Sequence, residues 1–107
     1  MREELIEGPP PCWILRTPDE ATQPLQFRIL PGNVKTIGRA ASADFVLDAP
    51  LVSRLHCQLA AGRAEIEAVD LSSTNGTYVN DQRVARGTLR DGDRLRVGAV
   101  ELVLLRS

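Results

Sequence analysis

The feature that most limits the fold of this 107-residue sequence is a short-range alternation of apolar and polar residues, broken by turn signals. Leu25, Phe27 and Ile29 alternate with polar neighbours, as do two later apolar sets, Ala64, Ile66 and Ala68, and Leu95 and Val97. Val100, Leu102 and Leu104 have the same spacing and predict the final strand. A period of two is typical of half-buried strands, and no run of about ten residues has helical spacing. The sequence therefore predicts an all-β fold, an antiparallel β-sandwich.

Dipeptides that favour turns separate the predicted strands. The four clearest are Pro31-Gly32, Asn80-Asp81, Asp91-Gly92 and Gly98-Ala99. Pro31-Gly32 suits a type II turn between strands at 25–30 and 34–38. Asn80-Asp81 tolerates the positive φ of a tight hairpin joining Thr77–Val79 to Gln82–Val84, and Gly98 suits the first central position of a type II′ hairpin.

Composition limits the classes of partner. The net charge of −1 provides no global attraction for nucleic acid or for an anionic membrane, and four aromatic residues offer little base stacking. Any anion site must therefore be local. Cys12 and Cys57 have neither metal-ligand spacing nor a disulfide-rich context, which favours a reducing, cytoplasmic location. No metal and no cofactor are expected.

The chain divides into two parts. Residues 1–11 are acidic and then proline-rich, without apolar periodicity, and are expected to form a flexible tail. Residues 12–107 are expected to form one domain. No segment approaches transmembrane length, and the acidic start does not resemble a signal peptide.

Three connections are unusually rich in polar residues: Gly38–Ser42, Ser53–His56 and Asp70–Thr77. A short extended stretch, Phe45–Leu47, separates the first two, and a hairpin that turns at 61–62 separates the second from the third. This up-and-down routing can bring all three connections to one end of the sandwich, where loops carry binding chemistry.

The side chains of these connections suit a phosphate group on an extended peptide. Arg39 and Arg54 carry planar, permanently charged guanidinium groups that match phosphate oxygens. Ser53 and Thr74 add compact hydroxyl donors, and Asn75 has the donor and acceptor needed to hold a peptide backbone. A few such contacts, less the cost of association, predict an affinity of about micromolar.

In order and spacing, these segments resemble the signature of the forkhead-associated domain family. The matching motifs are Gly38-Arg39, Ser53-Arg54-Leu55-His56, Asp70 with Asn75-Gly76-Thr77, and Val79-Asn80. The resemblance covers about residues 34–105 and includes Asp44–Asp48 and Leu89–Asp93. It departs at Ser72 and Asp81, where glycine is frequent, at Cys57, where alanine is common, and at Leu55, where a polar residue is often seen.

The resemblance implies an eleven-stranded sandwich that binds phosphothreonine in unstructured segments. Arg39 and Ser53 would contact the phosphate, Arg54 and Thr74 would add donors, and Asn75 would hold the peptide main chain. The structural supports of the site would be Gly38, His56, Asp70, Gly76 and Asn80. The implied partner is a phosphothreonine-containing protein or peptide, such as a Ser/Thr kinase or its substrate, in kinase-dependent signalling or assembly.

Two other classes of function stay open as alternatives. Ser53, His56 and Asp70 are the residue types of a catalytic triad, but no Gly-x-Ser-x-Gly elbow surrounds Ser53. A serine next to Arg54 is also better placed to meet an anion than to be deprotonated. The second alternative is a structural or protein-interaction domain whose partner binds independently of phosphate and leaves the site unused.

Overall fold

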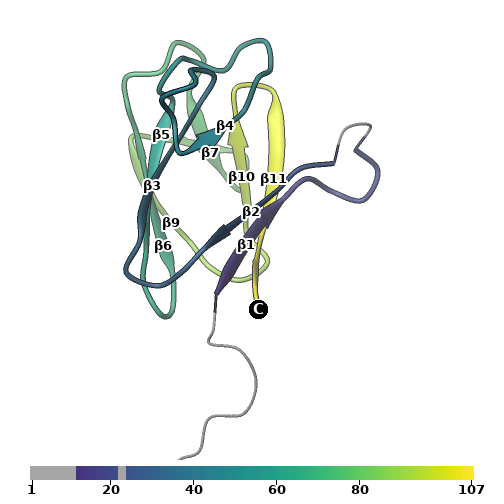
Figure 1. The fold of residues 1–107 in the computed structure, drawn as a ribbon, viewed down its shortest axis with the longest axis vertical. Helices are drawn as coiled ribbons and strands as arrows, with labels where there is room; N and C mark the ends of the chain where they lie inside the picture. Colours follow the sequence, from purple (N-terminus) through teal and green to yellow (C-terminus); the bar gives the residue numbers. More distant parts are fainter. Residues whose placement is uncertain (1–11, 22–23) are drawn as a thin grey trace, which may run out of the picture.

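The computed structural model describes residues 12–21 and 24–107, so the predicted tail at 1–11 lies outside the described residues. Within those ranges the chain forms eleven strands and no helix (Figure 1). The strands are β1 (Trp13–Arg16), β2 (Gln26–Ile29), β3 (Val34–Gly38), β4 (Phe45–Val46), β5 (Cys57–Ala61), β6 (Ile66–Asp70), β7 (Thr77–Val79), β8 (Gln82–Val84), β9 (Arg86–Leu89), β10 (Arg94–Val97) and β11 (Val100–Arg106). The part of the chain that the structure describes contains no helix that could cross a membrane.

The strands form two sheets that pack as a sandwich, which confirms the predicted fold class. One sheet has six strands in the order β2-β1-β11-β10-β7-β8, and the other has five in the order β4-β3-β5-β6-β9. All pairings but one are antiparallel. The exception is β3 with β4, which run parallel and place Ile37 opposite Phe45. The short pairing is tied by Asp44, whose carboxylate accepts a hydrogen bond from the backbone N–H of Thr36 at 2.9 Å.

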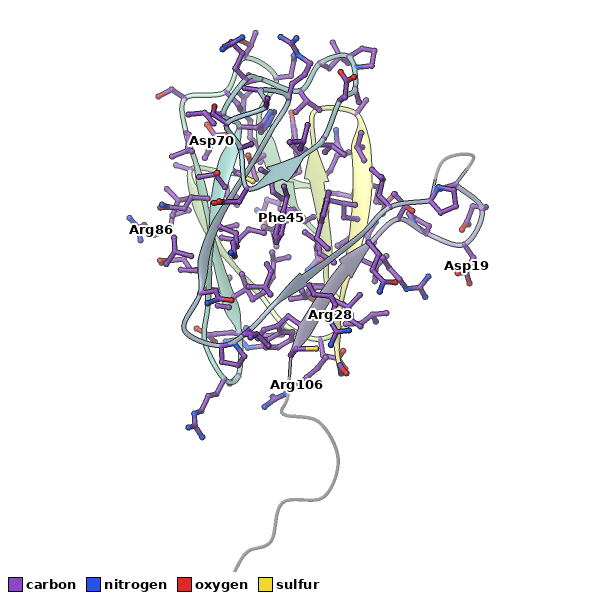
Figure 2. All side chains as sticks on the ribbon, in the orientation of Figure 1. Asp19, Arg28, Phe45, Asp70, Arg86 and Arg106 are labelled. Carbon is purple, nitrogen blue, oxygen red and sulfur yellow. The ribbon has the colours of Figure 1, made fainter. Side chains whose placement is uncertain are left out.

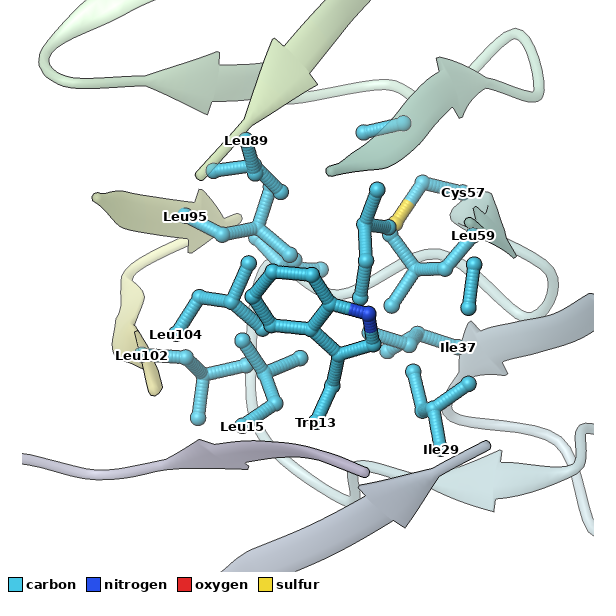
Figure 3. Packing of buried hydrophobic residues seen from close by; sticks show 14 of the residues in the cluster. Trp13, Leu15, Ile29, Ile37, Cys57, Leu59, Leu89, Leu95, Leu102 and Leu104 are labelled. Atoms are coloured by element: carbon cyan, nitrogen blue, oxygen red, sulfur yellow. The ribbon is translucent and has the colours of Figure 1, made fainter. Parts of the chain in front are cut away.

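The core lies between the sheets and follows the predicted alternation. In β10, Leu95 and Val97 are fully buried while Arg94 and Arg96 face outward. Figure 3 shows Trp13 among the aliphatic side chains of both sheets, and its indole N–H donates to the carbonyl of Gly62 at 2.8 Å. Ala64 does not belong to the alternating set, because β6 begins only at Ile66 and Ala64 lies exposed in the preceding turn.

The turns have the backbone conformations that the sequence predicts. Gly32 has a φ of 95°, and the N–H of Asn33 donates to the carbonyl of Leu30 at 2.9 Å, as in a type II turn. Asn80 and Asp81 both have positive φ, 49° and 70°, which is the requirement of a type I′ hairpin. Gly98 has a φ of 61° at the β10–β11 turn.

Sandwich topology brings the three polar connections together. The β3–β4 connection begins after Gly38, the β4–β5 connection ends before Cys57, and the β6–β7 connection spans the residues between Asp70 and Thr77. Figure 1 shows these loops at the end of the sandwich away from the C-terminus. The folding of the two sheets therefore positions every predicted binding residue at the same end or next to it.

Candidate functional site

A surface cleft of about 440 Å³ lies where the three loops meet. It is lined by Arg39, Pro50, Leu51, Val52, Ser53, Thr74 and Asn75. Four of the five binding residues predicted from sequence therefore line one cleft, although they are up to 36 positions apart in the chain (75 minus 39). We call this surface the loop cleft.

Arg39 is exposed but held in position. Its backbone N–H donates to the carbonyl of Ser53, and its side-chain Nε donates to the carbonyl of Val52 at 3.0 Å. The two terminal amino groups of the guanidinium donate to no described residue, so they are available to an incoming anion. A guanidinium oriented by the protein before binding loses less side-chain freedom on contact with phosphate.

The β4–β5 and β6–β7 loops are linked across the loop cleft by two side chains. Oγ of Ser53 accepts a hydrogen bond from the backbone N–H of Thr74 at 3.1 Å. The Ser53 hydroxyl hydrogen and the Thr74 hydroxyl are then left to donate to a ligand. Nδ2 of Asn75 donates to the carbonyl of Leu51 at 3.1 Å, which leaves the amide oxygen of Asn75 to accept from a peptide N–H.

His56 supports both loops from beneath the cleft and is fully buried. Its Nδ1 accepts from the backbone N–H of Ser53 at 3.0 Å, and its Nε2 lies 2.8 Å from the carbonyl oxygen of Gly76. A carbonyl oxygen only accepts, so Nε2 must carry the proton and the imidazole is the neutral Nε2–H tautomer. The structural role that the family resemblance gives His56 fits these contacts.

Asp70 ends β6 near the loop end of the sandwich (Figure 2), where it organises the β6–β7 loop without lining the loop cleft. Its carboxylate accepts from the N–H and hydroxyl of Ser73 and from the buried hydroxyl of Thr77, at 3.1, 2.6 and 2.7 Å. Burial raises the pKa of Asp70, but the hydrogen bonds from Ser73 and Thr77 outweigh it, so the pKa lies below its ordinary value. The loop is thus capped by an ionised carboxylate.

Two positions in or beside the site loops are restricted to glycine. A Cβ on Gly38 would overlap the backbone carbonyl of Arg54, because β3 passes directly against the β4–β5 loop. Gly76 has a φ of 92°, and a Cβ there would lie 2.7 Å from Nε of Arg83. Both positions therefore require glycine for geometric reasons.

Arg54 and Asn80, the other two residues predicted from the sequence, do not line the loop cleft. Arg54 is exposed on the same loop as Ser53, but its side chain does not line the loop cleft. Asn80 occupies the β7–β8 turn at the far end of β7 from the cleft, where its Oδ1 accepts from the N–H of Arg94 at 2.9 Å. Asn80 therefore holds β7 to β10 and supports the sheet rather than the site loops.

The sequence-based predictions missed several contributors to the loop cleft, among them Leu51 and Gly98. Leu51 has a φ of 73°, which is strained for a leucine, yet 55% of its surface is exposed at the rim. Gly98 was expected only to form a hairpin turn, but a Cβ there would lie 2.5 Å from the Leu51 carbonyl oxygen. No local pattern predicts the left-handed conformation of Leu51, whereas the absence of a side chain at Gly98 was a visible sign of close packing.

Other surfaces fit an anion less well. A larger cleft of about 600 Å³ lies between the β1–β2 loop, β4 and the start of β11. Its described lining includes the carboxylates of Glu20, Asp48 and Glu101 and no basic residue, so it would repel phosphate. The described residues also contain no group of three or more His, Cys, Asp or Glu side chains able to hold a metal ion.

The triad residues do not form a catalytic relay. Oγ of Ser53 contacts the backbone of Thr74, whereas His56 contacts the backbone N–H of Ser53 and not its hydroxyl. The Asp70 carboxylate is engaged by Ser73 and Thr77. Cys57 is not an activated nucleophile either, because burial and the nearby Asp70 charge raise the pKa of its thiol to about 12.

Comparison with known proteins agrees with this geometry. The FHA domain family matches residues 35–98, more than half of the chain. The glycogen accumulation regulator GarA of Mycobacterium tuberculosis is 33% identical over 100 residues, which cover 94% of this chain and 62% of GarA. The chain thus spans about three-fifths of the length of the first curated relatives that it matches.

Two solved structures extend the comparison. The FHA domain of CT664 from Chlamydia trachomatis superposes with a TM-score of 0.81 at 24% identity, covering 88% of this chain and 96% of that chain, and shows the common fold. A structure from an analysis of phosphothreonine-dependent FHA domain interactions superposes with a TM-score of 0.73 at 34% identity, covering 88% and 95%. Fold, loop geometry and family match agree, and the chain belongs to the forkhead-associated (FHA) domain family.

Proposed function

We propose that the loop cleft binds phosphothreonine in a partner protein, and that the chain acts as a phosphorylation-dependent binding module. The observation that carries this proposal is the convergence of Arg39, Ser53, Thr74 and Asn75 on one cleft with unused donors. Several charge-assisted hydrogen bonds, each about 1.5–3 kcal/mol net, can form with one doubly charged group. The preference for threonine is taken from the family and from its phosphothreonine-dependent relative.

The roles of the cleft residues follow from their free atoms. The terminal nitrogens of Arg39 and the hydroxyls of Ser53 and Thr74 would donate to phosphate oxygens. Asn75 would hold the main chain next to the phosphothreonine, because only its Nδ2 is occupied. Arg54 would add long-range attraction from the cleft margin.

We propose a binding role without catalysis. This proposal is supported by the contacts of His56, which bonds the backbone and not the hydroxyl of Ser53, and by the raised pKa of Cys57. Like the GarA relative, which is a regulator, the chain would act through association. As membership of the FHA family implies, the partner would be a phosphothreonine-containing substrate of a Ser/Thr kinase, or the kinase itself. Cys12 and Cys57 are buried and do not form a disulfide with each other, which supports a cytoplasmic location.

The test is a titration of the chain against a phosphothreonine peptide library, with phosphoserine and unmodified peptides alongside. Arg39→Ala is expected to weaken phosphothreonine binding at least about tenfold, because two or more charge-assisted contacts are lost. The thermal midpoint should change little, since Arg39 is exposed.

Arg63→Ala is the matched control. Arg63 is also an exposed arginine, but it lies in the β5–β6 turn, outside the loop cleft. A folded Arg39→Ala protein with the affinity of the wild type would refute the assignment. Equal binding of phosphorylated and unmodified peptides would favour the phosphate-independent alternative.

A further inference from the structure

A row of side chains crosses the outer face of the six-stranded sheet beside the loop cleft. Tyr78 of β7 is paired in register with Arg83 of β8 on one side and with Arg96 of β10 on the other. Directly paired residues of antiparallel strands share a face, so all three side chains lie on the same surface. That surface is the outer one, because Thr77 and Leu95, next to Tyr78 and Arg96 in sequence, are fully buried. We call these three residues the Arg-Tyr-Arg row.

Neither arginine of the row forms a salt bridge with an acid among the described residues. The guanidinium carbon of Arg96 lies 3.9 Å from the centroid of the Tyr78 ring, a cation–π contact that leaves its N–H groups free. The acids nearest in the sheet, Asp81 and Glu101, are both bound by Arg94, at 2.9 and 3.3 Å. Glu101 is also in register with Arg96 and so lies on the same face. Three arginines and two acids therefore leave one net positive charge on this part of the sheet, although the chain as a whole is slightly negative.

Arg83 extends from the row toward the loop cleft. Its Nε lies over Gly76, so close that a Cβ at Gly76 would meet it at 2.7 Å. Gly76 directly follows Asn75, which lines the cleft. The absence of a side chain at Gly76 thus provides the space in which Arg83 lies against the β6–β7 loop. The positive surface is continuous with the margin of the cleft.

We propose that the Arg-Tyr-Arg row is a second anion site, which binds an acidic side chain flanking the phosphothreonine in the same peptide. This inference rests on the proposed function and deepens it by naming the sequence context that the domain prefers. Guanidinium groups pair with carboxylate and with phosphate, so the flanking group is either an Asp or Glu or a second phosphorylated residue. Tyr78 holds Arg96 against the sheet and limits the rotamer freedom lost on binding.

The experiment compares three phosphothreonine peptides on the full chain by calorimetry at low salt. One has glutamine at the flanking positions, one has glutamate there, and one has glutamine with a second phosphothreonine. Each peptide is titrated into the wild type, Arg83→Gln/Arg96→Gln, and the control Arg63→Gln/Arg86→Gln. The control removes the same charge from the β5–β6 turn and from β9, where Arg86 pairs with Glu67.

A gain of about twofold to fivefold is expected for the wild type when glutamine is replaced by an anionic flank, as for an exposed ion pair. The gain should vanish in Arg83→Gln/Arg96→Gln and persist in the control, while all three proteins bind the glutamine-flanked peptide alike. A gain from glutamate identifies a carboxylate ligand, and a gain only from the second phosphate identifies a phosphate ligand.

Three results would overturn the proposal. The first is no gain in affinity for the wild type, and the second is an equal gain in both double variants. The third is that Arg83→Gln/Arg96→Gln loses as much affinity for the glutamine-flanked peptide as for the peptides with an anionic flank. Failure of the proposed function has a different signature, because the wild type would then bind no phosphopeptide at all. In that case the row loses its ligand as well.

Discussion

At the scale of single residues, the loop cleft depends on groups that do not line it. His56 connects the backbone of Ser53 to that of Gly76, so one buried side chain sets the spacing of two loops. Asp70 does the same within the β6–β7 loop through Ser73 and Thr77. Such residues act on binding only through the fold, and their variants should change stability first.

His56→Ala is expected to lower the free energy of unfolding by about 2–4 kcal/mol. The substitution leaves the N–H of Ser53 and the carbonyl of Gly76 without their partner and opens a buried cavity. Urea unfolding measures the effect, and Leu55→Ala, an exposed neighbour, is the control. An unchanged unfolding midpoint would contradict this role.

The lowered pKa of Asp70 predicts that the protein loses stability in acid. Its pKa is lowered in the folded protein, so the folded state binds fewer protons than the unfolded state. The stabilisation is therefore complete above the unfolded pKa of about 3.9 and is lost as the pH falls through the lower folded-state pKa. Asp70→Asn should show a shallower decline in unfolding free energy between pH 6 and pH 2, in roughly that range. Parallel curves for the two proteins would exclude Asp70 as a contributor.

At the scale of elements, the β7–β8 hairpin has a purely architectural role at its turn and a functional one at its base. The turn is closed by Asn80 and Asp81 in the left-handed region, and Asn80 binds the backbone of Arg94. The base begins at Thr77, which anchors the β6–β7 loop through Asp70. Stability and binding should therefore respond separately to substitutions at the two ends.

Asn80→Ala is expected to cost about 2 kcal/mol of stability, because alanine tolerates positive φ poorly and the bond to Arg94 is lost. Asn80→Gly should cost only about 1 kcal/mol, since glycine adopts the backbone conformation and only the bond is missing. Thermal unfolding distinguishes the two. Phosphopeptide affinity should stay within about twofold of the wild type for both, and a larger loss in a folded variant would place Asn80 in the site.

At the scale of the whole molecule, the net charge of −1 means that the overall field does not attract an anion. Attraction must come from the few groups around the loop cleft, at short range. Screening by salt acts over about 10 Å at 0.1 M and weakens contacts at hydrogen-bonding distance much less than it weakens distant charges.

Binding of a glutamine-flanked phosphothreonine peptide should therefore weaken by less than about tenfold between roughly 0.05 and 0.5 M salt. Titrations across this range with a single peptide measure the slope. A much steeper loss would mean that a wide charged surface, and not the loop cleft, supplies most of the affinity.

The sequence predicts the positions of the strands better than it predicts how the strands pair. The period of two locates most strands because it reflects burial of one face, which is a local property. It misplaces Ala64, because the β5–β6 turn reaches as far as Glu65. The parallel pairing of β3 with β4 was missed as well, because strand direction depends on where the β3–β4 loop leads.

By itself the sequence determined the all-β class, the turns at Gly32, Asn80 and Gly98, and the side chains that can bind phosphate. These depend on alternation, on backbone tolerance for positive φ and on hydrogen-bonding chemistry, which residues carry wherever they lie. Only the tertiary structure decided that Arg54 lies outside the cleft lining and that Arg83 reaches Gly76. Those facts are distances between segments remote in sequence, and such distances exist only once the two sheets have packed together.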